Sequence, residues 1–415
     1  MTDFYKKKIH MVGMKGVGMT ALAELLLSHG AIITGSDVKE KFHTDLVLKR
    51  LKIAPRLFSA KNITPKTDLI IYSSAYPEDH LERQKAKKLG IKEMSYAEAL
   101  SEIFNKKIGI MIAGSHGKTT TTALLGHIMA AAGMDPTVIV GGTVIAWDSN
   151  VRIGKSEWMV VEGDEYQKKF LNFKPAYLLI TNIDYDHPDT FSDRTSYRAA
   201  FKKLIRQTRK KVFNAEILKP LNQKVLKRFK SKYLLGEHNQ KNLTLVLAAT
   251  QELNISDENI KKGLLEFRGV RRRMEIYAQS GNMVIMDDYA HHPAEISATL
   301  KAVRARWPRH KITAIFQPHT FSRTKALLSE FAAAFKDADE IFLVPTYSSA
   351  RENIEGGEGM DEMLYGAVKK NNKNCFKGLP SEKTLAGGKG KRLIITMGAG
   401  DLWQFARKLA GKIRN

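Results

Sequence analysis

A glycine-rich loop between an apolar run and a helix-like run is the feature that most constrains the fold of this 415-residue chain. The stretch reads IMIAGSHGKTTTTALLGHI, from Ile110 to Ile128. Strand, loop and helix in this order are the setting in which backbone amides bind phosphate. The eight-residue pattern G-x-x-x-x-G-K-[ST] needs glycine at position 112, where Ile112 stands. The candidate phosphate-binding loop is therefore irregular, and it consists of Gly114, Ser115, His116, Gly117, Lys118, Thr119 and Thr120.

Two residues of this loop would have defined roles in a phosphate site. Lys118 would contact the β- and γ-phosphates of a nucleotide, and the hydroxyl of Thr119 would coordinate Mg²⁺. The alternative is an ordinary glycine turn followed by a Lys-Thr helix start. Four consecutive threonines, 119–122, begin a helix poorly unless their hydroxyls have another role, which favours the phosphate site.

Apolar runs of strand length alternate with helix-like runs along the whole chain. This alternation predicts α/β domains with parallel sheets and crossover helices. Three blocks can be distinguished, and the second and third begin near Lys107 and Gly269. The strand-like runs are 8–13, 31–37, 67–75, 107–114, 157–165, 176–187, 282–293, 311–319, 340–347 and 392–400, and the helix-like runs are 19–30, 80–90, 118–133, 294–308, 322–339 and 401–413.

Composition narrows the class of protein. The net charge is +24, and a strong positive field attracts nucleotides, phosphorylated substrates and nucleic acids. No recognition-helix, RNP-type or zinc-finger motif occurs in the sequence, so no nucleic-acid partner is expected. The single cysteine, Cys375, excludes an internal disulfide and fits a reducing cytoplasm. No apolar run approaches the ~18 residues of a membrane span, and the run after Lys8 is too short for a signal peptide, so no membrane association is expected.

A second glycine cluster, GMKGVG at 13–18, follows the first strand-like run. Asp37 closes the next strand-like run, an arrangement that resembles a dinucleotide fingerprint. Lys15 occupies the position of the second fingerprint glycine, which argues against an ordinary NAD site. A diphosphate at the helix N-terminus and a plain tight turn fit this cluster about equally well.

Two strand-like runs end in clusters of carboxylates. EGDE at 162–165 ends one run, and DYDH at 184–187 ends another. The carboxyl ends of parallel strands meet at one edge of a sheet, which is where ligands bind in such folds. Mg²⁺ prefers oxygen ligands in octahedral geometry. Both clusters are therefore candidate magnesium ligands beside the phosphate-binding loop.

Nine motifs in order, spread from Gly13 to Trp403, resemble the Mur ligases of peptidoglycan synthesis. They are GMKGVGMT, AGSHGKTTTT, VEGDE, TNIDYDHPDTF, GEHNQKN, FRGVRRRME, DDYAHHPAE, FQPHTFSRTKALL and TMGAGDLW. The resemblance implies three α/β domains. Residues 1–106 would form a Rossmann-like domain for the UDP substrate, 107–268 a P-loop ATPase-like domain with a mostly parallel sheet, trimmed between 191 and 236, and 269–415 a Rossmann-like domain for the amino acid.

The resemblance also implies a reaction. ATP phosphorylates the carboxylate of UDP-N-acetylmuramate, the amine of L-alanine attacks the acyl phosphate, and phosphate leaves. Two Mg²⁺ ions are implied, with Mn²⁺ as an alternative, and so is a cytoplasmic location. Attachment of a preformed tripeptide to the same sugar nucleotide is the nearest alternative. A nucleic-acid-binding P-loop ATPase and a non-enzymatic nucleotide-binding protein are alternatives of other classes, and monomer and dimer both remain open.

Individual roles follow from matching motif positions. The implied catalytic set is Lys118, Glu162, His187, His291 and Arg323, and the implied metal ligands are Thr119, Glu162 and His187. Besides the loop, the nucleotide would contact His238, Asn239, Asn242, Arg272, Arg273, Asp287 and Asp288. The UDP-sugar would contact Gly13, Lys15, Gly16, Val17, Gly18, Asp37, Ser73 and Ser74, and the amino acid would contact Tyr289, His291 and Arg323. Both His187 and His291 are candidates to help deprotonate the amine.

Overall fold

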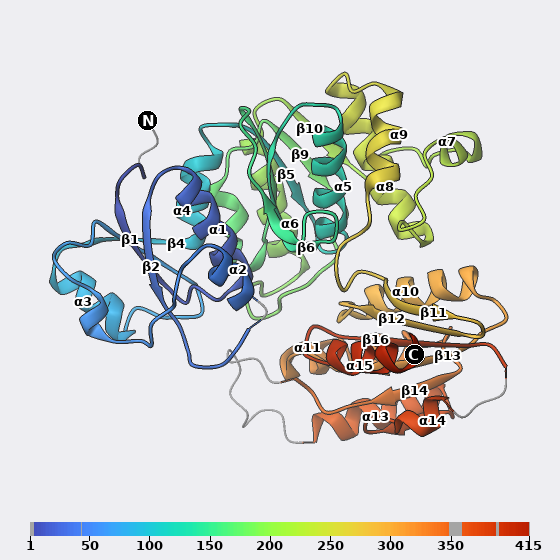
Figure 1. Ribbon diagram of the computed structural model, residues 1–415. Helices are drawn as coiled ribbons and strands as arrows, with labels where there is room; N and C mark the ends of the chain where they lie inside the picture. Colours follow the sequence, from blue (N-terminus) through green and yellow to red (C-terminus); the bar gives the residue numbers. More distant parts are fainter. Residues whose placement is uncertain (1–3, 43, 348–358, 387–389, 415) are drawn as a thin grey trace. The chain divides into compact units, whose positions relative to one another are not determined.

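The computed structural model describes residues 4–42, 44–347, 359–386 and 390–414 (Figure 1). Within these ranges the strands form three β-sheets. The chain divides into two compact units by its internal contacts. The first unit comprises residues 1–183, 198–218 and 245–266, and the second comprises residues 184–197, 219–244 and 267–415.

The first sheet is entirely parallel, with the strand order β2-β1-β3-β4. Its central strand β1 is buried from Ile9 to Val12, and the helices that connect the strands supply the rest of the core. The elements are β1 (Lys8–Val12), α1 (Val17–Ser28), β2 (Ile32–Ser36), α2 (Asp45–Arg50), η1 (Ala60–Asn62), β3 (Leu69–Tyr72), α3 (Leu81–Lys88), β4 (Lys92–Ser95) and α4 (Tyr96–Phe104).

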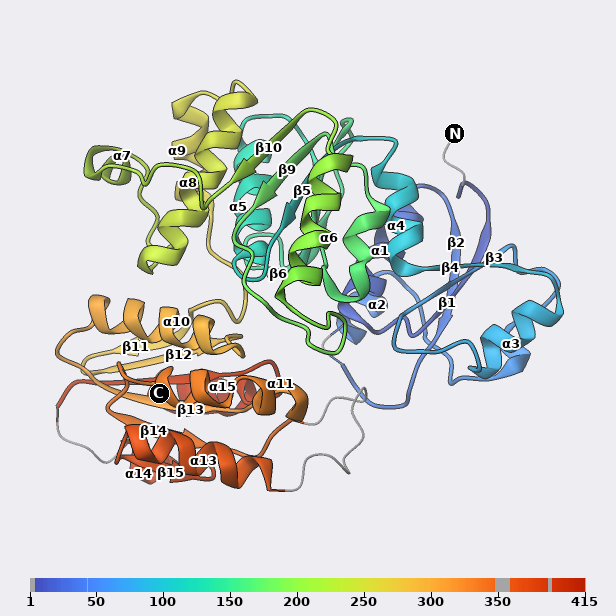
Figure 2. The same cartoon turned by 180° about the vertical axis from the view of Figure 1, so that it is seen from behind.

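The second sheet has six strands in the order β10-β9-β5-β8-β6-β7, and only β7 is antiparallel to its neighbour. Helix α5 lies on one face and α6 on the other (Figures 1 and 2), so β5 is buried on both faces and reads as a continuous apolar run. The elements are β5 (Ile108–Ala113), α5 (Lys118–Ala131), β6 (Thr137–Val144), β7 (Ser149–Arg152), β8 (Trp158–Glu162), η2 (Tyr166–Asn172), β9 (Tyr177–Ile180), α6 (Arg194–Gln207), β10 (Lys211–Asn214), α7 (Gln223–Arg228), α8 (Gly236–Glu252) and α9 (Asp257–Glu266).

The third sheet, in the second unit, has the order β11-β12-β16-β13-β14-β15, with only β11 antiparallel. One apolar cluster joins the sheet to α10 and α13, and a second joins its other face to α15. The elements are β11 (Glu275–Ser280), β12 (Met283–Asp288), α10 (Pro293–Arg306), β13 (Lys311–Phe316), α11 (Phe321–Ala326), α12 (Leu328–Ala333), β14 (Glu340–Leu343), α13 (Met360–Asn371), β15 (Cys375–Lys377), α14 (Glu382–Ala386), β16 (Arg392–Met397) and α15 (Trp403–Arg414).

The predicted fold class, α/β with mostly parallel sheets, is confirmed. In the described residues, six strands lie outside the predicted runs, β4, β6, β7, β10, β11 and β15, and so do helices α2, α4, α6, α7, α8, α9, α13 and α14. The expected helix 322–339 is interrupted at Leu327 (φ −122°, ψ 28°), which separates α11 from α12. The antiparallel pair β6–β7 was not expected from the apolar pattern. In the part of the chain that the structure describes, we find no helix that is long and apolar enough to cross a membrane.

Candidate active site

The phosphate-binding loop connects β5 to α5, as the sequence predicts. Gly114 has φ +139° and Gly117 has φ +81°, both in the region that favours glycine. A Cβ atom on Gly114 would lie 2.1 Å from Thr181 Oγ1, so this position has no room for a side chain. The loop therefore needs glycine for its backbone conformation as well as for the close approach of β9.

Asn182, which follows β9, clamps the loop from the side. Its Oδ1 accepts a hydrogen bond from the amide of His116 at 3.0 Å, and its Nδ2 donates to the His116 carbonyl, also at 3.0 Å. The carbonyl of Asn182 accepts the amide of Ser115. His116 thus has a structural role through its backbone. The sequence prediction did not include Asn182, although its place after a strand of the same sheet is a signal for such a role.

Lys118 is the best-defined cation of the site. Its Nζ donates to the carbonyl of Gly114 at 2.6 Å and to Glu165 Oε1 at 3.0 Å. Burial alone would lower the pKa of Lys118, but the charges of Glu165 and Glu162 raise it above its usual value. The ammonium is therefore charged and aligned along the loop. Glu165 is one of the candidate magnesium ligands. Its carboxylate forms an ion pair with Lys118.

Thr119 and Glu162 bring the two predicted oxygen ligands together. Thr119 Oγ1 donates to Glu162 Oε1 at 2.9 Å, and the amide of Gly141 donates to Glu162 Oε2 at 2.7 Å. One hydroxyl and one carboxylate suit Mg²⁺, which commonly takes its remaining ligands from phosphate and water. Among the described residues no group of three or more His, Cys, Asp or Glu side chains converges on one point.

In the second unit, Asp186 and Arg323 form a buried ion pair. The guanidinium Nε and Nη2 atoms each lie 3.2 Å from Asp186 Oδ1. Burial would raise the pKa of Asp186, but Arg323 and the nearby His187 lower it well below its usual range, so the carboxylate is ionised. His187 has φ +58°, and its amide donates to the same carboxylate. Three residues from the DYDH and FSRT motifs are thus in contact.

His291 lies close to this pair. Its Nδ1 is 3.0 Å from the carbonyl of Tyr289, so Nδ1 carries the hydrogen and Nε2 is the acceptor. Burial, assisted by the charge of Arg323, lowers the pKa of His291 to about 3. The imidazole is therefore neutral at neutral pH.

The predicted nucleotide contacts of the third sheet already have partners within the protein. Arg272 donates from Nε to Asp287 Oδ2 at 3.0 Å and from Nη2 to the carbonyl of Gly398. Asp288 accepts the amides of Met274 and Ala290, and burial raises its pKa to about 6. These contacts fix the start of the third sheet. The guanidiniums of Arg272 and Arg273 both lie 5.1 Å from the ring of Tyr289.

The predicted adenine motif lies on the first turns of α8. Asn239 Nδ2 donates to the carbonyl of Leu235 at 2.8 Å, and Asn242 Nδ2 donates to Asn239 Oδ1 at 3.2 Å. Both asparagines are buried. Desolvation lowers the pKa of His238 to about 4, so this ring is neutral as well.

The first glycine cluster forms the turn between β1 and α1. The carbonyl of Ser36 accepts the amides of Gly13 and Met14, and Asp37 Oδ2 accepts the amide of Lys15 at 2.6 Å. The Lys15 ammonium donates to the carbonyls of Val38 and Glu40. Two predicted substrate contacts, Lys15 and Asp37, therefore stabilise the turn itself. Ser73 and Ser74 follow β3 at the same edge of the sheet, where the Ser73 amide donates to Val12.

Comparisons with known proteins agree with this arrangement. The Mur ligase family, catalytic domain, matches residues 8–108. The Mur ligase middle domain matches residues 112–261, and the Mur ligase, glutamate ligase domain, matches residues 272–400.

Full-length relatives point to one branch. The UDP-N-acetylmuramate–L-alanine ligase of Desulfitobacterium hafniense (strain Y51) is 36% identical over 97% of this chain and 99% of its own length. That of Clostridium kluyveri is 37% identical over 97% and 98%. Among solved structures, UDP-N-acetylmuramate-alanine ligase from Thermotoga maritima has TM-score 0.78 and 26% identity, covering 98% of this chain and 99% of its own. A murein peptide ligase from Psychrobacter arcticus has TM-score 0.68 at 20% identity, over 98% and 99%, and it shows the shared fold alone. The resemblance predicted from the nine motifs is confirmed, and the chain belongs to the Mur ligase family.

Proposed function

We propose that this chain is an ATP-dependent ligase that joins L-alanine to the carboxylate of UDP-N-acetylmuramate. The observation that carries the proposal is its full-length similarity to relatives named for this reaction, at 36% and 37% identity. The loop at 114–119 supports it, because its lysine, threonine and glycines have the geometry of a nucleotide phosphate site. We expect it to act in the cytoplasm, as a monomer or dimer and without a nucleic-acid partner.

The chemistry needs placement and charge neutralisation more than covalent help from the protein. A carboxylate oxygen of the sugar attacks the γ-phosphorus of ATP, and the bond to the β-phosphate bridging oxygen breaks to release ADP. Lys118 would offset the charge that develops on the phosphates. When bound, Mg²⁺ or Mn²⁺ would reduce the repulsion between the two anions. Thr119 and Glu162 would hold one ion, and His187 is the proposed ligand of a second.

The alanine amine then attacks the acyl carbon, the carbon–oxygen bond to phosphate breaks, and the departing phosphate takes up the proton that the nitrogen loses. His291 has a pKa of about 3, so it holds a proton too weakly to be an effective base near neutral pH. We propose that its Nε2 accepts a hydrogen bond from the amine and thereby orients it. Arg323 would bind the alanine carboxylate through Nη1, because its Nε and Nη2 already contact Asp186.

A phosphate-release assay tests the proposed function. The protein is incubated with ATP, Mg²⁺ and UDP-N-acetylmuramate, and release is compared with L-alanine, with tripeptide, and with RNA or DNA. We expect release that requires both the UDP-sugar and L-alanine. Release that requires tripeptide would assign the chain to the murein-recycling reaction. Release stimulated by nucleic acid alone would contradict both ligase assignments.

The variant Lys118→Ala separates nucleotide chemistry from sugar binding. We expect turnover to be lost while UDP-N-acetylmuramate still binds in calorimetry, because Lys118 contacts only the loop and Glu165. Loss of sugar-nucleotide binding in a variant that is still folded would contradict separate sites. Thr208→Val is a suitable control, since the Thr208 hydroxyl donates to the Leu204 carbonyl on α6.

A further inference from the structure

Glu82 on α3 is a completely buried carboxylate that none of the roles above uses. Its Oε2 accepts the hydroxyl of Ser36 at 2.5 Å. Its Oε1 accepts the amide of Ser59 at 3.1 Å and Asn62 Nδ2 at 2.7 Å. The carboxylate therefore joins three segments of the first domain: the end of β2, the segment 59–62 that contains η1, and α3.

His10 on β1 completes this network. Its ring lies between two hydroxyls, with Nδ1 2.9 Å from Thr34 Oγ1 and Nε2 3.2 Å from Ser36 Oγ. Nε2 is also 3.7 Å from Glu82 Oε2. Burial would raise the pKa of Glu82, but the nearby His10 ring and the hydrogen bonds from Ser36, Asn62 and the Ser59 amide lower it below its usual value. Glu82 is thus an ionised group in the core, and an ion there is costly unless its partners are complete.

The network ends at the glycine turn of the predicted UDP-sugar site. Ser36, whose hydroxyl Glu82 holds, accepts the amides of Gly13 at 2.9 Å and Met14 at 3.2 Å through its carbonyl. The next residue, Asp37, accepts the amide of Lys15 at 2.6 Å. Three consecutive amides of the turn therefore donate to the adjacent residues Ser36 and Asp37. Of these two residues, Ser36 is fixed by Glu82.

We propose that Glu82 is a positioning residue for the UDP-sugar: by fixing Ser36, it sets the conformation of the turn 13–18 that receives the substrate diphosphate. This inference rests on the proposed function for the identity of the ligand. When a supporting residue is lost, the groups that bind the ligand shift by fractions of an ångström. The loss of such a residue typically costs ~10–100-fold in affinity or activity.

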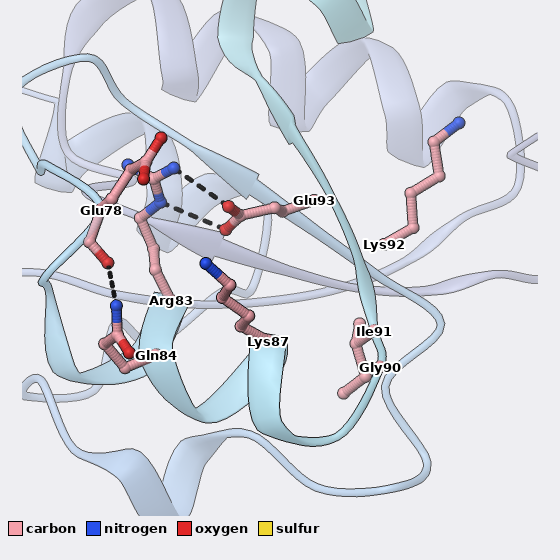
Figure 3. A pocket seen from close by; sticks show the side chains of 8 residues that line it. All are labelled: Glu78, Arg83, Gln84, Lys87, Gly90, Ile91, Lys92 and Glu93. Atoms are coloured by element: carbon pink, nitrogen blue, oxygen red, sulfur yellow. Dashed lines mark hydrogen bonds and ion pairs between the residues drawn. The ribbon is translucent and has the colours of Figure 1, made fainter.

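The neighbouring residue provides a matched comparison. Arg83 forms a bidentate ion pair with Glu93, through two hydrogen bonds of 3.0 and 3.1 Å. Its guanidinium stacks over the ring of Tyr72. Figure 3 shows this pair in a pocket of about 410 Å³, with the side chain of Lys87 directed toward Glu93. Glu93 thus has strong partners in the same domain, and within the described ranges it makes no direct hydrogen bond or ion pair to residues 13–18.

The experiment compares Glu82→Gln with Glu93→Gln in the full-length protein. We expect Glu82→Gln to raise the Kd for UDP-N-acetylmuramate in calorimetry and the corresponding KM by ~10-fold or more. The KM values for ATP and L-alanine, and kcat at saturating UDP-sugar, should stay within about threefold of wild type, because the phosphate-binding loop is untouched. Glu93→Gln should leave all of these values near those of the wild type.

Ser36→Ala removes only the hydroxyl that Glu82 holds, and it carries the test if Glu82→Gln does not fold. The inference is overturned if the folded variant binds UDP-N-acetylmuramate as tightly as wild type, or if all three KM values rise together. Wild-type binding of the UDP-sugar without L-alanine-dependent phosphate release would overturn the proposed function alone, and the variant Kd would still decide the role of Glu82. Absence of UDP-sugar binding by the wild type would overturn both.

Discussion

Asn182 illustrates how one side chain can hold a functional loop. It donates to and accepts from the backbone of His116, so its loss would release two hydrogen bonds from the phosphate-binding loop at once. We predict that Asn182→Ala raises the KM for ATP by ~10–100-fold, as expected when a supporting contact is removed, while the Kd for the UDP-sugar stays unchanged. Steady-state kinetics with varied ATP, together with calorimetry, measures both values.

Asn105 offers a control of the same chemistry. It also makes two backbone bonds, from Nδ2 to the Asn172 carbonyl and from the Lys174 amide to Oδ1, but these lie away from the loop. Asn105→Ala should lower stability without a specific change in the KM for ATP. Equal effects of the two variants on this KM would show that the clamp at His116 has no special role.

The lowered pKa of His238 predicts how the stability of the protein depends on pH. Its pKa is about 4 in the folded protein and about 6.5 when exposed, so the unfolded state binds a proton more readily between these values. The contribution of His238 to the free energy of unfolding is present above pH ~6.5 and is lost as pH falls toward 4. The loss is at most about 3 kcal/mol. Asp288, with a pKa raised to about 6, acts in the opposite direction, since its folded form retains a proton more strongly.

Replacement of His238 by glutamine tests this sign. We predict that denaturant unfolding of His238→Gln shows a shallower loss of stability than wild type between pH 6.5 and 4. A slope identical to that of wild type would mean that His238 is not the group that titrates. His310→Gln is the comparison variant. Burial also lowers the pKa of His310, but this residue lies on the loop before β13.

The candidate site was predictable from the sequence where its residues are close along the chain. Gly114, Lys118 and Thr119 belong to one motif, and Glu162 is the last residue of β8, which pairs with β5. Asn182 was missed because its place after β9 predicts only that it lies near the loop, whereas its role comes from two side-chain bonds to His116. Glu82 was missed for a similar reason: its partner Ser36 is 46 positions away in the sequence.

At the scale of elements, two glycines set how closely helices pack on the central sheet. A Cβ on Gly126 of α5 would lie 2.7 Å from Val138 on β6, and a Cβ on Gly263 of α9 would lie 2.8 Å from the Cα of Ile128. Such distances are too short for a packed side chain. The helices α5 and α9 therefore approach at backbone distance, which fixes α5 behind the phosphate-binding loop.

Gly263→Ala should therefore destabilise the protein although alanine favours helices. The new methyl group meets a backbone atom that cannot move aside, and overpacking of this kind costs ~1–3 kcal/mol. Gly366→Ala on α13 is the control, since no atom lies within 4 Å of its added Cβ. That variant should gain ~0.4–1 kcal/mol through helix propensity and a less flexible unfolded chain. Denaturant midpoints of the two variants give the comparison, and a gain in both would contradict the packing argument.

The elements themselves were largely predictable, because a strand buried on both faces reads as a continuous apolar run. Ile108–Ala113, Leu69–Tyr72 and Arg392–Met397 are of this kind. The strands outside the predicted runs include β4, β6, β10, β11 and β15. They also include β7, Ser149–Arg152, whose polar residues carry no strand signal and whose pairing with β6 includes a register shift. Its conformation depends on tertiary pairing, which outweighs local propensity in edge strands.

At the scale of the whole molecule, the positive charge is unevenly distributed. Residues 194–232 contain fourteen lysines and arginines and a single acidic residue, Glu216, so they account for +13 of the net +24. Arg194, Arg198, Lys202 and Arg206 are exposed on α6 at spacings of four residues, and they form no ion pair among the residues described. Like charges at this spacing repel across one helix face.

This repulsion leads to a prediction about ionic strength. Replacing those four residues of α6 by glutamine should raise the unfolding midpoint at low salt, by ~0.2–0.5 kcal/mol for each repulsive pair removed. The gain should shrink as salt increases, because the Debye length falls from ~30 Å at 0.01 M to ~10 Å at 0.1 M. The control replaces four paired lysines, Lys92, Lys301, Lys311 and Lys377, whose partners are Glu102, Glu237, Glu340 and Glu362.

Both variants lower the net charge by the same amount, so they separate local from global effects. If repulsion along α6 matters, the α6 variant is stabilised and the control is not, since the control loses attractive pairs worth ~0–1 kcal/mol each. If only total charge matters, both midpoints rise together, and the argument from α6 fails. Thermal unfolding of the two variants and the wild type at several NaCl concentrations decides between these outcomes.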